Sequence, residues 1–336
     1  MDPGNVSLIT AQNFKDIEKD IPHSYHPVLL GGSGGDGSVV FCVHKNVVNA
    51  NLADLVAIKF PGPHPGNVNI DVIALHKLSQ LTSPLKNRVL ELVDWDRESE
   101  EDQCKWMATR ALFPPLTLDE MLYMKNERIP RAFLAHIFIQ LGEVLGFLHW
   151  NAHITHGDFN FRNIMVDTHS RVESGFPNLV VIDFGRAENT KPEDPIDNGQ
   201  TIREAEDVNQ FLGYLSRYID SPETGAKSES ESESEPEPEP EPDPDPDPDP
   251  DPDPEPDVMD EDWVSVETNQ KWEEFLRYCD EERMGLYPAK NLGELWEDYG
   301  AAATEIVRVE AAAAVPFVDE IIRGLIAPVE AILASL

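Results

Sequence analysis

The chain has 336 residues, 40% of them hydrophobic, and its 63 Asp and Glu outnumber its 26 Lys and Arg, so the formal net charge is −37. Residues 228–262 hold 18 of the acidic residues and no basic one, which leaves −19 for the remainder. Such an acidic chain disfavours nucleic acids and anionic membranes as partners. The three cysteines, Cys42, Cys104 and Cys279, match no metal spacing, and their odd number disfavours a disulfide scaffold.

Neither end of the chain has the pattern of a targeting or membrane-spanning segment. The first ten residues, MDPGNVSLIT, lack the basic and apolar regions of a signal peptide. The apolar tail at 315–336 is interrupted by charged residues and Pro328, so it is too broken to cross a bilayer. We therefore expect a cytoplasmic or, alternatively, nuclear protein with no membrane partner.

The first third of the chain is rich in β-forming residues. Residues 1–25 read as a polar lead-in, and residues 26–112 carry short β-rich runs separated by Gly, Pro and Asn. Strands are predicted at 39–43, 55–60, 89–95 and 104–112. One helix is predicted at 70–81, where Ile70, Ile73, Leu75 and Leu78 lie near helical spacing.

The remainder is mostly helical in pattern. Residues 113–227 contain a long apolar helix at 131–150, two short strands at 163–167 and 178–184, and a helix at 204–219. Residues 263–336 continue with helices at 271–283 and 292–300 and a C-terminal helix. The sequence therefore predicts an α+β fold of two lobes, a small β-rich N-terminal lobe and a larger helical C-terminal lobe.

Residues 228–262 interrupt the helical half with alternating acids and prolines. This pattern can form neither helix nor strand ladder and repels itself, so a disordered, solvated insert is predicted. The insert has two interpretations. It is either an acidic segment for docking or ion binding, or a repeat that is merely tolerated on the surface, and we favour the tolerated repeat.

A glycine-rich string precedes the first strong strand. Gly32, Gly34 and Gly37, followed by Val39, fit the pattern G-x-G-x-x-G-x-V. Backbone amides of such a loop can close over phosphate oxygens. A glycine-rich hairpin turn without ligand gives the same string. Because a strand rather than a helix follows, a Rossmann dinucleotide turn is disfavoured.

Lys59 ends the otherwise apolar run VAIK. A lysine at that position must find an anion or point out of the core, because desolvation of an unpaired ammonium is costly. After a glycine loop it becomes a candidate phosphate ligand.

The segment from His156 to Asn163, HGDFNFRN, is the most distinctive one. It lies between a long helix and a strand, and IDFG follows the next strand. Asp158, Asn163 and Asp183 supply oxygen ligands of the kind that Mg²⁺ prefers together with substrate phosphates. Each aspartate alone could be a turn or capping residue.

In this order, the glycine loop, VAIK, HGDFNFRN and IDFG resemble the protein-kinase-like superfamily over residues 25–215. The resemblance implies an ATP- and Mg²⁺-dependent phosphotransferase with a hinge within 107–113 beside the adenine. It implies that Gly32, Gly34 and Gly37 cover the ATP phosphates and that Val39 contacts the adenine. Lys59 would contact the α- and β-phosphates, and Asp158 would accept the proton of the acceptor hydroxyl. Asn163 and Asp183 would bind Mg²⁺.

Several positions depart from the family pattern. The helix that should supply a glutamate partner for Lys59 offers Asp71, one methylene shorter and only twelve residues further on, so the sequence leaves their pairing open. Gly157 replaces an arginine that would meet a phosphorylated activation segment. Asn160 replaces a lysine, and Arg162 is the candidate that neutralises the transferred phosphoryl group in its place.

The segment after IDFG is also unusually short. Residues 191–193 are the sole candidate for its family end mark, and Thr190 is the one hydroxyl between 186 and 191. Residues 206–208 and 211–213 resemble the next helix of the family. The resemblance implies that Asp207 braces the loop at 156–163 by hydrogen bonds.

Three functions are compatible with these motifs. The preferred one is an atypical serine/threonine protein kinase. The segment HGD and the short activation segment also resemble aminoglycoside and choline phosphotransferases, whose acceptors are small molecules. A pseudokinase that binds partners is the third. The sequence leaves open the acceptor and the oligomeric state.

Overall fold

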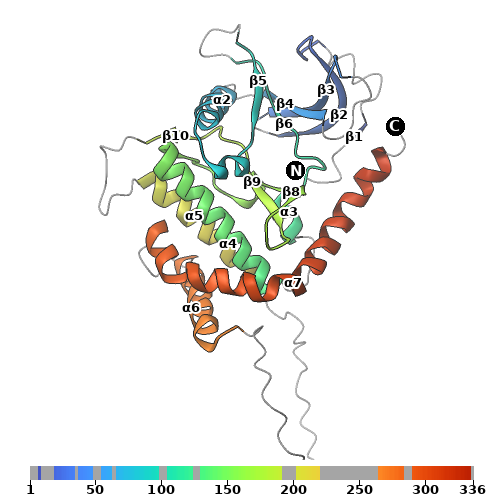
Figure 1. Cartoon of the computed structure of the whole chain (residues 1–336). Coiled ribbons are helices and arrows are strands. Elements are labelled where there is room, and N and C mark those ends of the chain that lie inside the picture. Colours follow the sequence, from blue (N-terminus) through green and yellow to red (C-terminus); the bar gives the residue numbers. More distant parts are fainter. Residues whose placement is uncertain are drawn as a thin grey trace, which may run out of the picture.

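The computed structural model describes the chain in ten stretches. The described residues are 7–8, 19–34, 37–47, 54–62, 66–97, 104–123, 129–190, 202–219, 264–283 and 290–333. The acidic insert at 228–262, Trp263 and the segment 191–201 lie outside them. The fold is mixed α+β, with an antiparallel sheet in the N-terminal part and helices in the C-terminal part (Figure 1).

The N-terminal sheet has six antiparallel strands in the order β1-β2-β3-β4-β6-β5. The predicted strands at 39–43 and 55–60 are confirmed, whereas those at 89–95 and 104–112 are shorter than expected. The bounds are Ser7–Leu8 (β1), Tyr25–Gly34 (β2), Gly37–His44 (β3), Leu55–Pro61 (β4), Leu92–Trp95 (β5) and Met107–Arg110 (β6).

Helix α2 (Gly66–Ser79) follows β4 and packs against β4 and β5. Its buried face carries Val68, Val72, Leu75 and Leu78 at helical spacing, as a core-facing helix requires. The predicted helix is confirmed, but Ile73, one of the residues near helical spacing, is 58% exposed. On the helix, Ile73 lies just outside the face that Val72 and Leu75 bury.

The long helix of the C-terminal part is α4 (Arg131–Gly146), which continues as a π-helical turn (Phe147–Ala152). By length and apolar composition alone, residues 131–152 could cross a membrane, but 89% of the most apolar window is buried within the protein. The helix is therefore the centre of the helical core, as the predicted buried helix at 131–150 required.

The short elements around α4 are one helix and two pairs of strands. Helix α3 (Leu118–Tyr123) precedes α4. The two-residue strands β7 (Ile154–Thr155) and β10 (Glu188–Asn189) pair with each other, and β8 (Ile164–Arg171) pairs with β9 (Pro177–Val181). The predicted strand at 178–184 ends at 181, so residues 182–184 form the connection that carries Asp183.

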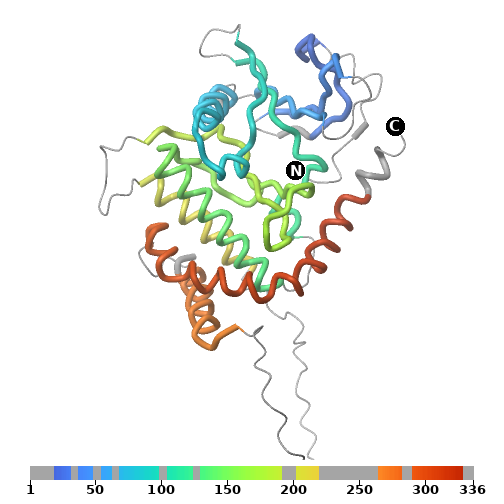
Figure 2. Tube along the Cα trace, in the orientation of Figure 1, coloured from blue at the N-terminus to red at the C-terminus, as the bar shows by residue number. Residues whose placement is uncertain are grey.

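The remaining helices surround α4. They are α5 (Ile202–Ile219), α6 (Val266–Arg283) and α7 (Leu292–Leu333). Helices were predicted separately at 292–300 and near the C-terminus, but α7 is continuous through Pro316. A proline inside a helix removes one backbone donor and kinks it. Figure 2 shows α7 bending so that its second half rises towards the level of the sheet.

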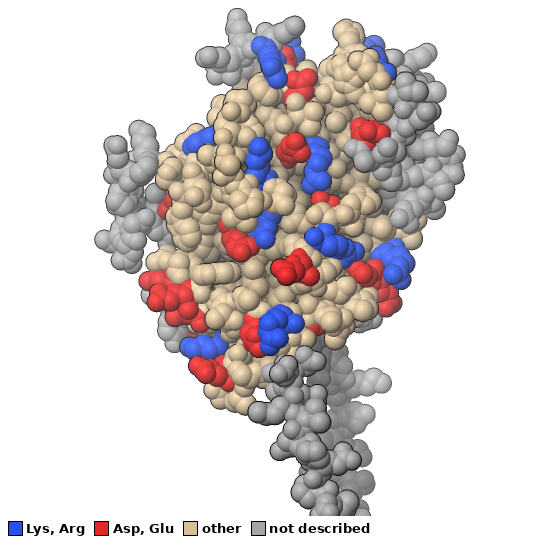
Figure 3. Space-filling model, in the orientation of Figure 1, with Lys and Arg blue, Asp and Glu red and all other residues tan. Residues whose placement is uncertain are grey.

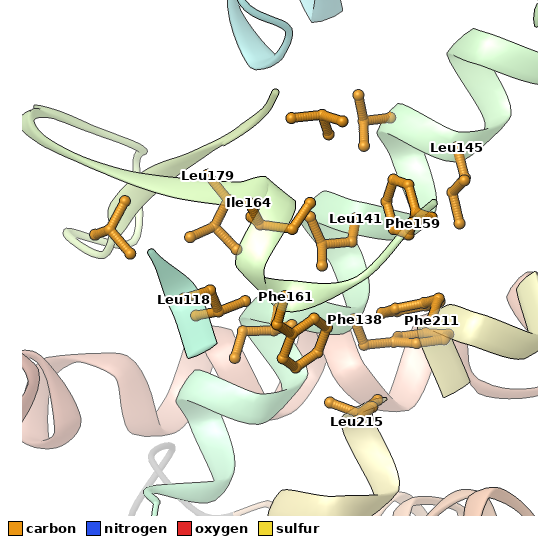
Figure 4. Close-up of a cluster of buried hydrophobic side chains, with 14 of the residues drawn as sticks. Leu118, Phe138, Leu141, Leu145, Phe159, Phe161, Ile164, Leu179, Phe211 and Leu215 are labelled. Carbon is orange, nitrogen blue, oxygen red and sulfur yellow. The ribbon is translucent and has the colours of Figure 1, made fainter. Parts of the chain in front are cut away.

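Aromatic side chains fill the helical core. Phe138 of α4 contacts Phe211, Trp272, Phe275 and Trp296, with ring centroids 4.5–6.3 Å apart. Figure 4 shows Phe138 and Phe211 side by side in this cluster. Trp272 is completely buried and anchors this core, whereas Trp296 is 39% exposed and lies at its edge.

The described surface does not segregate its charges on the face drawn in Figure 3. Basic and acidic side chains are interspersed there, so the acidity of the body does not form one continuous patch on that face.

Residues 228–257 contain no apolar residue except proline, so they have nothing to bury in a core. Helices α5 and α6, which flank the acidic insert, pack directly on each other. Replacing 228–257 by a short Gly/Ser linker should leave the melting temperature within a few degrees, because loop length affects stability only logarithmically. A collapse of the melting temperature would contradict this.

Candidate active site

Lys59 joins three elements of the fold. It lies in β4 opposite Val39 of β3 and Met107 of β6. Its Nζ donates to Asp71 Oδ2 of α2 at 2.7 Å and to Asp183 Oδ1, after β9, at 2.6 Å. The pairing with Asp71, which the sequence left open, is therefore made.

Burial controls the charge state of Asp71. Its carboxyl group is fully buried, and the loss of water raises the pKa of Asp71 to about 6. The charge of Lys59 opposes this rise and that of Asp183 adds to it. No hydrogen bond of normal geometry reaches Asp71 Oδ1 within the described residues, so the backbone N–H of Phe184 opposes the rise only weakly.

Lys59 is held in its charged form. Burial alone would lower the pKa of Lys59, but the charges of Asp71 and Asp183 and the hydrogen bonds to both outweigh it and raise that pKa. An ammonium group has three N–H donors, and these two contacts use two of them. One donor is left for an incoming anion.

The predicted loop at 156–163 is anchored by alternate residues. Phe159 and Phe161 are completely buried and point into the core cluster, where Figure 4 labels both. Asp158, Asn160 and Arg162 alternate with them and are more exposed. This alternation holds three polar side chains on one side of the loop.

Asp207 braces this loop from α5, as predicted. Its buried carboxylate accepts from the backbone N–H of His156 at 2.7 Å and of Gly157 at 2.9 Å, and it contacts Nε2 of His149 at 3.0 Å. Nδ1 of His156 accepts from the backbone N–H of Asp158 at 3.3 Å, so its Nε2 donates to the carbonyl of Ile182 at 2.9 Å. Burial lowers the pKa of His156, which favours this neutral form.

Local sterics explain why position 157 is a glycine. Its φ is +75°, and a Cβ there would lie 2.3 Å from the carbonyl oxygen of Arg186. Only glycine fits both conditions. Gly157 therefore allows a close approach between the loop and the segment after Asp183.

Asp158 is held by amides. Nδ2 of Asn160 donates to its Oδ1 at 3.0 Å, and Nδ2 of Asn163 donates to its Oδ2 at 3.1 Å. Its side chain is 33% exposed. The carboxylate is thus fixed in orientation but open to solvent.

Asn163 and Asp183 lie next to each other across the β8–β9 hairpin. The backbone N–H of Ile182 donates to the carbonyl of Asn163 at 2.9 Å, and Asp183 has a φ of +61°. This left-handed conformation is one that Asp adopts more readily than most residues. Asp183 is thereby turned towards Lys59.

Arg162 does not contact Asp158 through any hydrogen bond or ion pair described. It is 72% exposed and its Nε donates to Asp119 Oδ2 at 3.2 Å. Asp119 also accepts from the hydroxyl of Tyr218 at 2.8 Å. Its predicted catalytic role stays a prediction.

Arg186 is the residue that sequence reasoning missed. Its Nη1 lies 3.9 Å from Asp158 Oδ1, and its side chain is 62% exposed. Its place directly after IDFG was the available signal, but the contact depends on the approach of two loops that are 28 positions apart.

The glycine string forms the β2–β3 hairpin. Gly32 pairs with Val39, and Gly34 pairs with Gly37, while the tip residues 35–36 lie outside the described part. Gly37 has a φ of +141°, and a Cβ there would lie 2.1 Å from the carbonyl oxygen of Phe60. The hairpin end therefore packs closely against the end of β4 beside Lys59.

No protein-family model matches the chain, and a search of curated proteins finds no significant match. The functional assignment therefore depends on the contacts of Lys59, Asp158, Asn163 and Asp183.

Gly157→Ala should destabilise the protein by about 1–3 kcal/mol, because alanine is strained at this φ and meets a carbonyl oxygen. Gly213→Ala is the matched control: it lies in α5, and a Cβ there meets nothing within 4 Å. That control should be neutral or stabilising by about 0.4–1 kcal/mol. Equal free energies of unfolding for the two variants, measured in urea, would refute the steric explanation.

The raised pKa of Asp71 predicts a pH dependence. Its carboxyl group titrates near 3.8 when unfolded and near 6 when folded, so the folded protein holds the proton more tightly. The stability that Asp71 contributes is complete below about pH 4 and is lost as the pH rises through 6.

Asp71→Asn cannot lose this proton. The free energy of unfolding of the variant minus that of the wild type should therefore rise by about 3 kcal/mol between about pH 4 and pH 7. Titrating groups that do not interact with Asp71 are common to both chains, so their contributions cancel in the difference. A difference that stays constant with pH in urea titrations would contradict the prediction.

Proposed function

We propose that the protein is an ATP-dependent phosphotransferase with a protein-kinase-like fold, which transfers the γ-phosphoryl group to the hydroxyl of a serine or threonine. The observation that carries the proposal is the pair of contacts from Lys59 to Asp71 and Asp183. These contacts hold an ammonium with one remaining donor at the junction of the sheet and the helical part. The glycine hairpin ends beside it.

Lys59 would bind the α- and β-phosphates. A charged lysine that is only 14% exposed is costly to desolvate, and Asp71 and Asp183 offset that cost. The β2–β3 hairpin containing Gly32, Gly34 and Gly37 would cover the phosphates with its backbone amides. Val39 lies opposite Lys59 in the ladder and would contact the adenine.

Asn163 and Asp183 fit a Mg²⁺ ion. Nδ2 of Asn163 donates to Asp158, so its Oδ1 remains available, and Asp183 has Oδ2 in addition to the oxygen that contacts Lys59. Mg²⁺ in phosphotransferases is typically held by one or two such oxygens and by substrate phosphates. No group of three or more His, Cys, Asp or Glu that could hold a metal occurs among the described residues, so a self-sufficient protein cage is not the expectation. Bound Mg²⁺ would neutralise phosphate charge.

Asp158 would orient the acceptor hydroxyl and accept its proton. Its two oxygens are fixed by Asn160 and Asn163, and Asp207 fixes the backbone on its N-terminal side. Such preorganisation is what proton transfer from a bound hydroxyl requires. Arg162 keeps its proposed role of neutralising phosphoryl charge only if it leaves Asp119.

A small-molecule acceptor is the second candidate. It is favoured by the short connection between Asp183 and α5, which begins at Ile202. A pseudokinase would bind nucleotide without turnover, so turnover of Mg-ATP separates it from both enzymes.

Mg-ATP should stabilise the protein. A ligand at one hundred times its Kd adds about 2.7 kcal/mol, which a thermal-shift assay detects. Asp183→Asn should weaken this shift because it removes a ligand charge. Asp158→Asn should keep the shift but lower phosphoryl transfer by roughly two to four orders of magnitude, because Asp158 faces the acceptor.

Two results would contradict the proposal. A melting temperature that does not change at millimolar Mg-ATP would refute nucleotide binding at this site. Undiminished transfer by Asp158→Asn would mean that the base lies elsewhere.

A further inference from the structure

An exposed arginine stands beside the proposed base. Arg186 Nη1 is 3.9 Å from Asp158 Oδ1, beyond hydrogen-bond distance, and no other acidic residue is recorded within 4 Å of it among the described residues. The backbone of Arg186 is fixed by its contact with Gly157, whereas its guanidinium is 62% exposed. An acceptor hydroxyl that reaches Asp158 must therefore pass a positive charge.

The end of α5 lies beside the same loop. Phe161, three residues after Asp158, stacks on Tyr218 with ring centroids 5.8 Å apart and 9° between the planes. The hydroxyl of Tyr218 donates to Asp119, which also accepts from Arg162. The chain therefore leaves α5 next to the catalytic loop.

A further arginine stands at this exit. The guanidinium of Arg217 lies over the ring of Tyr214, 4.4 Å from its centroid, and Tyr214 in turn contacts Phe161 at 5.6 Å. Arg217 is exposed. Positive charge is thus present both beside Asp158 and where the chain departs from α5.

The sequence that follows α5 is rich in hydroxyls flanked by acid. Ser228, Ser230, Ser232 and Ser234 alternate with glutamates in SESESESE, and Ser228 comes nine residues after Ile219. Nine extended residues span up to about 30 Å. Asp207, which contacts Gly157, lies about 18 Å along α5 from Ile219, at 1.5 Å per residue. These serines are therefore within reach of Asp158.

Charge favours the same match. Outside residues 228–262 the chain has a net charge of −19, and this net charge repels a run of glutamates. Arg186 provides positive charge beside Asp158, where an acceptor must bind. A serine between two glutamates is therefore better matched here than one flanked by lysines.

We propose that the acceptor of this site is a serine flanked by carboxylates, and that the protein phosphorylates its own Ser228–Ser234 run in cis; this rests on the proposed phosphotransferase function. In the step, the serine Oγ forms a bond to the γ-phosphorus of ATP. The bond from that phosphorus to the β–γ bridging oxygen breaks, and ADP leaves with the electron pair. The serine proton passes to Asp158 and then to water.

The test uses the full chain with Mg-ATP. Mass spectrometry should find phosphate on Ser228, Ser230, Ser232 or Ser234, with a fractional rate that stays constant across a roughly hundredfold dilution, as a reaction in cis requires. The four serines changed together to alanine should remove the label, and Asp158→Asn should do the same.

Specificity is tested in trans on the variant that lacks the four serines. A peptide copying residues 228–241 should be phosphorylated in preference to the same peptide with every Glu replaced by Lys. Arg186→Glu should raise the KM for the acidic peptide about fivefold or more and should improve transfer to the basic one. Arg277→Glu, which reverses an exposed charge on α6, is the matched control and should change neither peptide's KM.

Three results would overturn the inference. They are a preference for the basic peptide, phosphate confined to residues outside Ser228–Ser234, or transfer to a small molecule with none to serine. The first two leave the proposed function standing if Mg-ATP still binds and turns over, whereas the third favours the small-molecule phosphotransferase instead. Absence of nucleotide binding would instead remove the proposed function and this inference with it.

Discussion

A buried ammonium must be neutralised, and the arrangement around Lys59 follows from that requirement. Strand β4 carries the lysine to a position that is 14% exposed, where α2 supplies Asp71 and the connection after β9 supplies Asp183. These contacts link the N-terminal sheet to the helical part. The same pair of carboxylates keeps Lys59 charged, so the interaction that joins the two parts also maintains a cation at their junction. Removing Lys59 would leave the buried carboxyl group of Asp71 without its cationic partner in a nearly dry site.

The loop at 156–163 depends on a second constraint, which acts on its backbone. Phe159 and Phe161 fasten the loop to the core, and the buried Asp207 binds the amides of His156 and Gly157. Asp158 lies between Gly157, whose amide Asp207 binds, and the buried Phe159, so its side chain is kept on the outer side of the loop. This is why Asp158 remains accessible although its neighbours are buried, and why a glycine is needed where the loop meets the carbonyl of residue 186.

Much of this could be predicted from sequence because it is local. Strands with alternating apolar residues, the apolar helix at 131–150 and the order of the motifs are readable from short windows, and Asp207 was predicted as a brace. Other features depend on how distant segments approach. Asp71 contacts Lys59 only because α2 packs on the sheet as it does, and Arg186 contacts Asp158 only because two loops meet. Neither arrangement can be read from a short stretch of sequence. The continuity of α7 through Pro316 was missed because proline locally predicts a helix end, whereas packing along α4 stabilises the longer helix.

The most direct test of the proposed site is a crystal structure with Mg²⁺ and a non-hydrolysable ATP analogue. The phosphates should contact Lys59 beneath the β2–β3 hairpin, and the metal should be coordinated by Asn163 and Asp183, with the γ-phosphate facing Asp158. Nucleotide bound elsewhere, or a metal that contacts neither Asn163 nor Asp183, would contradict the proposed phosphotransferase.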